Sequence, residues 1–166
     1  MWTQWGQWRR VLAAALVAGG VAIVLNTVAL AAADLVPLTT ARGGLLRLLT
    51  MWIGVPLGLP VPKGAVFQTA FHLIVGLAMA VFYAVLLEKR LPGEAYVKGL
   101  IYAAAVWLLN AAVVLPLTGE GFAGSRNLTL SGMLWFAAAH TLFFVVLAVG
   151  YAKISRLREG TKRKGL

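Results

Sequence analysis

Four long apolar stretches alternate with shorter polar segments along the chain. A transmembrane helix needs about 20 mainly apolar residues, and each stretch approaches or exceeds that length. Strands of a membrane barrel would alternate apolar and polar positions, whereas these stretches run on without such alternation. The pattern predicts an all-α fold: one membrane domain over residues 1–166, built as an up-and-down four-helix transmembrane bundle. The predicted spans are residues 11–33, 66–87, 100–117 and 132–152.

Composition strengthens the membrane assignment. Apolar residues make up 61% of the chain, and its mean hydropathy is +0.86. Soluble domains average about 45–50% apolar residues, and a chain this short cannot bury the surplus in one core. A cleaved signal peptide is the alternative for the first stretch, because Ala31–Ala33 weakly resembles a cleavage site. The run is longer than the roughly 7–15 apolar residues of such signals, so we expect it to be retained as a span.

Basic residues predict the orientation. Four spans place both termini on one side, which would carry eleven basic residues against four on the other, namely Arg42, Arg47, Lys63 and Arg126. The positive-inside rule makes the richer side cytoplasmic, as in a multi-pass protein of the cell inner membrane. The basic tail at residues 153–166 is expected to contact anionic lipid head groups. Because the basic residues flank spans, the net charge of +10 does not indicate a nucleic-acid partner.

The long connection between the first two spans is too apolar to lie free in water. Leucines, Trp52 and Ile53 would give residues 40–54 a broad apolar face, so we predict a short helix lying in the outer interface. A fifth span over residues 43–62 is the alternative. It would bury Arg47, thread three prolines through lipid and move the basic tail to the outer side.

Polar residues recur at one depth in the four predicted spans. Spans one and three each carry an asparagine, Asn26 and Asn110, and spans two and four each carry a histidine, His72 and His140. At about 1.5 Å per residue, all four lie roughly 9–12 Å from the outer ends. Polar side chains at membrane depth usually face the bundle interior, so they are predicted to form one polar layer. Candidates to extend this layer are Thr69, Thr141 and Tyr83.

The residues leave three interpretations of this layer open. It could join the helices through hydrogen bonds worth about 0.6–2 kcal/mol each. Spans two and four are diagonal partners in such a bundle, so His72 and His140 could hold one haem b iron between them. A proton relay or metal site is the third interpretation. Two histidines leave a zinc ion short of ligands, and we therefore predict no metal site.

Two further features concern packing and the outer loop. Small residues four apart, Ala15 with Gly19 and Gly76 with Ala80, predict close helix crossings. The loop after span three carries three glycines together with Glu120 and Arg126. This loop could cover the polar layer as a lid, and its charged pair, if exposed, would add little stability.

One resemblance follows from the order of these residues. His72, Gly76 and Tyr83, then Pro116 and the loop at residues 119–124, and finally His140 resemble small prokaryotic four-helix membrane proteins of the YagU-like type. The resemblance covers spans two to four. The residue after His140 is Thr141, where the family pattern has leucine. The resemblance implies a prokaryotic membrane protein and no particular chemistry.

Three functions follow as hypotheses. The sequence has no recognisable nucleophile–base pair, paired carboxylates or phosphate-binding loop, so we lean against an enzyme. The leading hypothesis is a scaffold or accessory subunit beside other membrane subunits, because the spans are apolar and little chain lies outside them. The alternative is a cytochrome b-like electron-transfer subunit with haem held by the two histidines. A small transporter or channel is the third, although no charge lies within the spans.

Overall fold

The predicted fold class is confirmed by the structure. The computed structural model describes residues 2–36, 38–41, 44–58 and 64–164, with the side chains of 2–4 and 158–164 excepted. Within these ranges the chain is all-α, and four helices are long and apolar enough to cross a membrane. The predictions for Arg42, Lys63 and most of the basic tail lie outside the described side chains. The candidate spans are Trp5–Leu35, Ala65–Leu87, Ala95–Leu117 and Leu130–Leu157.

Several spans are built from more than one helical segment. The first is α1 (Trp2–Ala32) with the 3-10 turn η1 (Ala33–Leu35). The second joins α3 (Ala65–Phe82) to the π-helical η3 (Tyr83–Leu87). The third comprises α4 (Ala95–Leu109), the π-helical η4 (Asn110–Val114) and α5 (Leu115–Leu117). The fourth is the single helix α6 (Leu130–Lys164), which continues beyond the apolar stretch into the basic tail.

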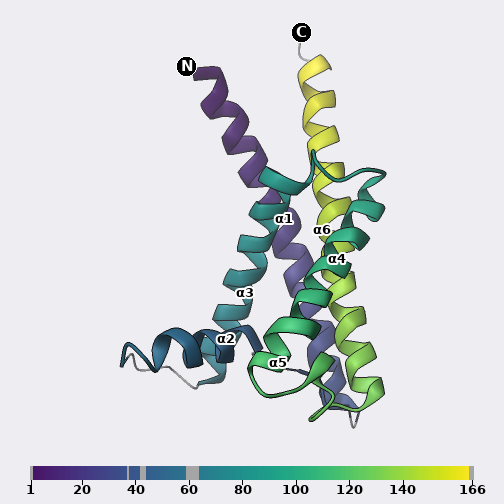
Figure 1. The fold of residues 1–166 in the computed structure, drawn as a ribbon. Coiled ribbons are helices and arrows are strands. Elements are labelled where there is room, and N and C mark those ends of the chain that lie inside the picture. Colours follow the sequence, from purple (N-terminus) through teal and green to yellow (C-terminus); the bar gives the residue numbers. More distant parts are fainter. Residues whose placement is uncertain (1, 37, 42–43, 59–63, 165–166) are drawn as a thin grey trace.

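The four long helices form a bundle with both termini at one end, which we call the terminal end (Figure 1). The opposite end, where α2 lies, is called the α2 end. The most extensive packing is between α1 and α6, between α4 and α6, and between α1 and α3. Helices α3 and α4 meet through side chains such as Tyr102, whose hydroxyl donates to the Met79 carbonyl at 3.3 Å. The backbones of α3 and α4 do not pack closely on each other, and residues 64–70 at the start of the second span are exposed, so this side of the bundle is less enclosed.

Small residues make the close helix crossings possible, as the sequence predicted. A Cβ on Gly19 would lie 2.4 Å from the Ala80 Cβ, and one on Gly76 would lie 2.5 Å from the Ile23 side chain. Both glycines therefore lie at the crossing of α1 and α3. The crossing of α4 and α6 depends on Gly99, where a Cβ would come within 2.8 Å of the backbone of Phe144 and Val145.

The π-helical segment η4 has a local cause in Pro116. Proline lacks the amide hydrogen that a regular helix would donate to the carbonyl four residues earlier, and its ring collides with that carbonyl. Just before it the backbone widens, so that the Leu115 amide donates to the Asn110 carbonyl five residues back. The spacing of apolar residues in the sequence does not reveal this change, because the residues of η4 are as apolar as those of the regular helix before it.

A short helix projects sideways from the bundle at the α2 end (Figure 1). It consists of α2 (Gly44–Leu49) continued by η2 (Thr50–Gly54), which confirms a helix in the predicted interfacial segment. Met51, Trp52 and Ile53 on it are exposed, as suits a helix lying along an interface. It belongs to the shorter apolar helices rather than to the candidate spans, so the described residues do not support a fifth span.

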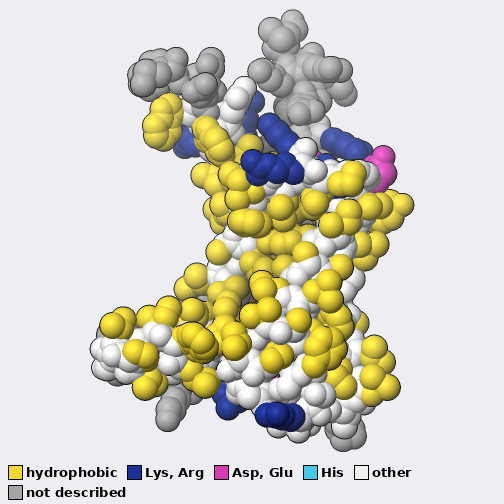
Figure 2. Space-filling view, viewed as in Figure 1, with side chains coloured by type: hydrophobic (Ala, Val, Ile, Leu, Met, Phe, Trp, Pro, Cys, Tyr) yellow, Lys and Arg dark blue, Asp and Glu magenta, His cyan; other side chains and the backbone are white. Residues whose placement is uncertain are grey.

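The surface separates into an apolar middle and charged ends. Figure 2 shows apolar side chains covering the waist of the molecule, with basic side chains gathered at the terminal end and fewer at the α2 end. Exposed valines and leucines along α1 contribute to this apolar surface. The molecule therefore contacts the lipid bilayer as an integral membrane protein.

Candidate functional site

Asn26 forms the centre of a polar junction between three helices. Its side chain is 1% exposed, and its Nδ2 donates to the Ala139 carbonyl of α6 at 2.8 Å. Its Oδ1 lies 2.9 Å from Nε2 of His72 on α3. Because Oδ1 can only accept, His72 is the donor and carries its proton on Nε2. We call Asn26, His72 and Ala139 the Asn26 junction, and it ties α1 to both α3 and α6.

His140 lies next to this junction in the sequence of α6. Its Nδ1 donates to the Phe136 carbonyl at 2.8 Å, so that in the neutral ring Nε2 keeps the lone pair. The ring also packs against Phe136, with centroids 4.1 Å apart. The structure thus gathers Asn26 and both histidines from the predicted polar layer at one level of the bundle.

Asn110 and the threonines are placed differently. The Asn110 Nδ2 donates to Val106 of its own helix at 3.1 Å, and Thr141 donates to Ala137 in the same way at 2.8 Å. Thr69 is exposed on α3. Gly99 contacts Phe144 and Val145, and extending this antiparallel pairing places Asn110 about 9 Å nearer the α2 end than His140, at about 1.5 Å per residue.

Tyr83 belongs to a second group of residues, nearer the terminal end. It is 1% exposed and its ring lies 6.0 Å from those of both Tyr102 and Tyr151. Tyr102 in turn packs on Phe144 with centroids 4.3 Å apart. These four residues form an aromatic cluster in which η3, α4 and α6 meet. The sequence suggested Tyr83 only as a candidate to extend the polar layer, and Tyr83 lies three helical turns beyond His72.

One interhelical hydrogen bond involves a residue that the sequence analysis did not single out. Nε1 of Trp135 on α6 donates to the Ala29 carbonyl of α1 at 2.8 Å, about one turn from the Asn26 junction. A tryptophan just inside the end of a span usually signals the lipid interface, which hides this packing role. The bond adds a second polar link between α1 and α6.

The arrangement at the histidines does not fit haem as it stands. Bis-histidine ligation would use a ring nitrogen of His72, but its Nε2 is bonded to Asn26. The Asn26 side chain is itself fully enclosed and bonded to α6, so a macrocycle would have to displace it. Haem binding by His72 and His140 therefore stays a prediction, which an absorption spectrum of purified protein tests. Among the described residues, no group of three or more His, Cys, Asp or Glu could hold a metal ion.

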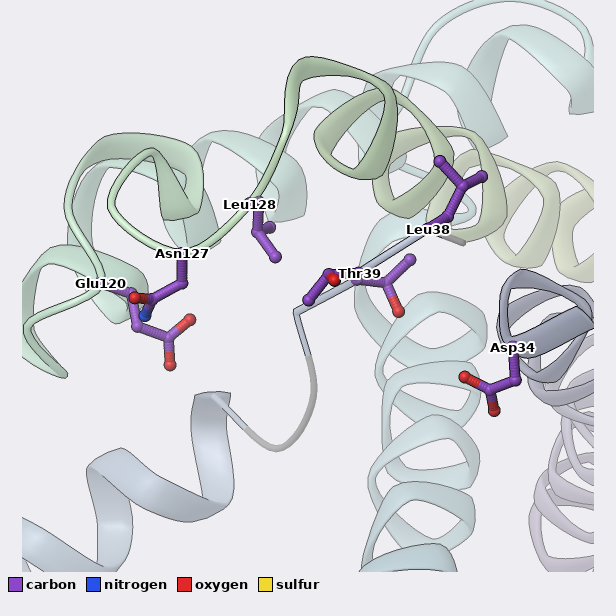
Figure 3. Close-up of a pocket in the computed structure, with 7 residues that line it drawn as sticks. Asp34, Leu38, Thr39, Glu120, Asn127 and Leu128 are labelled. Atoms are coloured by element: carbon purple, nitrogen blue, oxygen red, sulfur yellow. The ribbon is translucent and has the colours of Figure 1, made fainter. Parts of the chain in front are cut away.

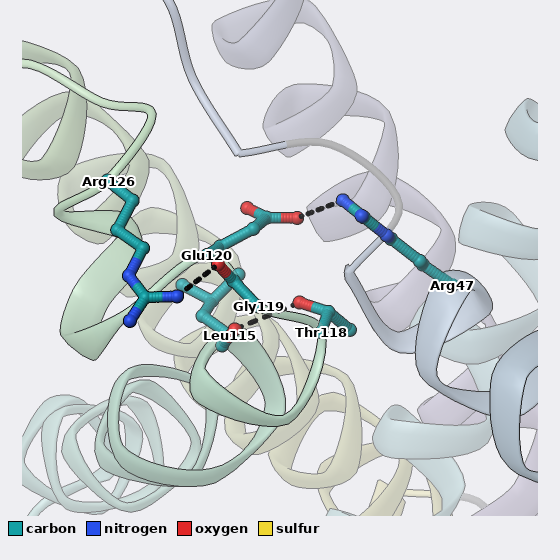
Figure 4. Close-up of polar contacts among 6 residues, drawn as sticks. All are labelled: Arg47, Leu115, Thr118, Gly119, Glu120 and Arg126. Carbon is teal, nitrogen blue, oxygen red and sulfur yellow. Dashed lines mark hydrogen bonds and ion pairs between the residues drawn. The ribbon is translucent and has the colours of Figure 1, made fainter.

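The loop at the α2 end is shaped by glycines and joined to α2 by an ion pair. Gly119, Gly121 and Gly124 all have positive φ angles, which residues with a Cβ rarely adopt. Glu120, 7% exposed, pairs with Arg47 of α2 at 3.3 Å (Figure 4). Arg126, the partner that the sequence suggested for Glu120, donates to the Gly119 carbonyl at 3.3 Å.

No family model, curated protein or solved structure matches the chain. The resemblance to YagU-like proteins remains a prediction. The structure supports a small integral membrane protein. Most of the polar groups described within its spans form hydrogen bonds to backbone atoms of the same chain.

Proposed function

We propose that the protein is an accessory subunit that packs beside another membrane protein through the exposed faces of α3 and α4. The observation that carries this proposal is the exposure on this side of the bundle: residues 64–70 are all exposed, and the backbones of α3 and α4 do not pack closely on each other. In a closed up-and-down bundle these two consecutive helices would pack along their length. Here each packs closely on one side only, α3 against α1 and α4 against α6.

The composition of the exposed faces supports a partner on this side. Only 22% of the apolar stretch in the second span, Ala65–Leu87, is buried inside the molecule, against 39% in the first span, Trp5–Leu35. The exposed face of α1 consists of valines and leucines, which suit lipid. The exposed faces of α3 and α4 include several alanines, which allow another helix to approach closely. These alanines are Ala70 and Ala78 on α3 and Ala104 and Ala105 on α4.

The internal polar groups support a structural role rather than a catalytic one. Asn26 and His72 bond to each other and to α6, while His140 bonds to its own helix. Hydrogen bonds of this kind hold membrane helices in register. A rigid bundle with a fixed register can present a constant surface to a neighbouring subunit.

Photo-crosslinking tests this proposal. A photoreactive amino acid at Ile74 on α3 should form a discrete adduct with another membrane protein, because this side chain is 65% exposed among the alanines of α3. Val24 is the matched control: it is 56% exposed on α1, at nearly the same depth, since Ile23 contacts Gly76. The same probe at Val24 should label lipid and give no discrete protein band.

Two results would contradict the accessory role. One is equal labelling from both positions, with no discrete protein adduct at Ile74. The other is an adduct of twice the mass of this chain, which would show that a second copy covers the surface. A discrete heteromeric adduct at Ile74 that is absent at Val24 supports the proposal.

We further propose a prokaryotic inner-membrane location with both termini in the cytoplasm. The gathering of basic side chains at the terminal end (Figure 2) supports this orientation through the positive-inside rule. The basic residues of the tail would then lie beside anionic lipid head groups of the cytoplasmic leaflet.

Cysteine labelling of intact cells checks the orientation, because the chain contains no cysteine. Ser125→Cys lies in the exposed loop at the α2 end, and Glu94→Cys lies exposed at the terminal end. A membrane-impermeant maleimide should label Ser125→Cys in intact cells and Glu94→Cys only after permeabilisation. The reverse pattern would place the termini outside and refute the assignment.

A further inference from the structure

The helix that projects sideways from the bundle carries few polar side chains. We call residues 44–58, which comprise α2, η2 and the turn that follows, the arm. Besides the indole of Trp52, the polar side chains of the arm are Arg47 and Thr50. Water is a poor surrounding for such a segment, yet most of its larger apolar side chains are exposed. These exposed side chains include Leu49, Met51, Trp52, Ile53, Val55 and Leu57.

The exposed apolar side chains of the arm do not share one narrow face. Met51, Trp52 and Ile53 follow one another in the sequence and are 45%, 63% and 48% exposed. Successive helical residues point roughly 100° apart, so these three side chains together cover about half of the circumference. A helix that lies on the interface keeps a strongly polar face toward water. A helix that is apolar on most of its sides is instead surrounded by an apolar medium.

The polar side chains of the arm are satisfied within the chain. The Thr50 hydroxyl donates to the Leu46 carbonyl one turn earlier at 2.8 Å. Arg47 forms its ion pair with Glu120 at 3.3 Å. Polar groups at membrane depth need internal partners of this kind, because acyl chains offer none. The arm therefore meets the condition for immersion in lipid as well as having the surface for it.

The polar connections at the α2 end mark the level of water and head groups. A pocket of about 400 Å³ there is lined by polar side chains that include Asp34, Glu120 and Asn127 (Figure 3). The Arg47 side chain, 57% exposed, reaches Glu120 at this level. Long basic side chains extend in this way from an apolar surface to the polar boundary of a membrane. The backbone of the arm accordingly lies on the apolar side of that boundary.

The types of exposed residue on the arm favour lipid over a protein partner. Helix contacts in membranes depend on small residues that let backbones approach, and the faces of α3 and α4 offer alanines for this. On the arm, Gly54 is buried, and the exposed apolar positions of its helix carry leucine, methionine, tryptophan and isoleucine. We propose that the arm is immersed among the acyl chains of the leaflet at the α2 end, just beneath the head groups. There it anchors the bundle and sets its height and tilt in the bilayer.

Spin labelling of the full chain in phosphatidylcholine–phosphatidylglycerol vesicles tests this proposal. A nitroxide on Met51→Cys, Trp52→Cys or Ile53→Cys, each a single variant, should relax faster with oxygen, which partitions into acyl chains, than with a water-soluble nickel chelate. Val24→Cys, 56% exposed on α1, is the control for lipid contact. Ser125→Cys, exposed in the loop at the α2 end, is the control for water contact. All three arm positions should follow Val24→Cys, with an oxygen-to-nickel accessibility ratio severalfold above that of Ser125→Cys.

Two other outcomes would overturn the immersion of the arm. Nickel access at one or more of the three positions would show a helix that lies on the interface with a side in water. Low access of both reagents at all three positions would show that protein, such as a second copy of the chain, covers the arm. The vesicles contain this chain alone, so the result does not depend on whether the proposed accessory role is correct.

Discussion

Replacing Asn26 with leucine is expected to lower the free energy of unfolding by about 3 kcal/mol, the sum of two interhelical hydrogen bonds and the polar groups they leave behind. Leucine has a similar size, so the packing around position 26 changes little. The variant loses the bonds to Ala139 and His72, and the His72 Nε2–H then lies without its acceptor. Denaturant titration in mild detergent micelles, followed by tryptophan fluorescence, measures the difference.

The same substitution at Asn110 is the matched control. Asn110 donates only to Val106 within its own helix in the contacts described, so Asn110→Leu should cost less than about 1 kcal/mol. A double-mutant cycle of Asn26→Leu with His72→Leu should give a coupling energy of about 1–2 kcal/mol. Equal losses at positions 26 and 110, or a coupling energy near zero, would mean that the Asn26 junction does not hold the helices together.

The apolar pattern predicted the architecture because lipid imposes a simple rule on length and polarity. Each span must be helical to satisfy its backbone, so runs of the right length identify the spans directly. The ends of the helices do not coincide with the ends of the apolar stretches. Helix α1 extends before Val11 and α6 extends past Ala152, because helix propensity does not stop where the apolar stretch does.

The sequence could predict the site only where the depth of a residue in the membrane is enough to determine which residues it contacts. Asn26 and His72 share a level, and a polar side chain at that level turns inward, so the sequence could bring them together. The direction in which a side chain points around its helix axis is a separate quantity. The π-helical segment before Pro116 changes this direction along the third span. Depth from the span end therefore grouped Asn110 with the histidines, while its described bond stays within its own helix.

The sequence could not predict the pocket or the Arg47–Glu120 ion pair, for a different reason. Both depend on how two connections fold over the end of the bundle, and connections carry no periodic signal. The glycines of the loop at residues 119–124 indicated a shaped turn, but they did not show which element would lie beside it. Arg47 reaches Glu120 because α2 begins against η4 and α5, where Gly44 faces Val114 and Leu115.

Replacing Gly99 with leucine should have an effect of similar size, about 3 kcal/mol, by forcing α4 away from α6. A Cβ at this position would lie 2.8 Å from both the Phe144 carbonyl and the Val145 Cα. Backbone atoms cannot move aside as a flexible side chain can, so the two helices must separate. Separation also weakens the contact of Tyr102 with Phe144, whose centroids lie 4.3 Å apart.

Ala104→Leu on the same helix is the control, because Ala104 is exposed and an added side chain there meets lipid or detergent. Its effect on the free energy of unfolding should stay within about 0.5 kcal/mol. Gly76→Ala should fall between the two variants, since its nearest neighbours are side-chain atoms of Ile23, which can change rotamer. Comparable losses for Gly99→Leu and Ala104→Leu would show that α4 and α6 do not cross at Gly99. The order Gly99, Gly76, Ala104 follows if backbone contact, rather than volume alone, sets the cost of an added side chain.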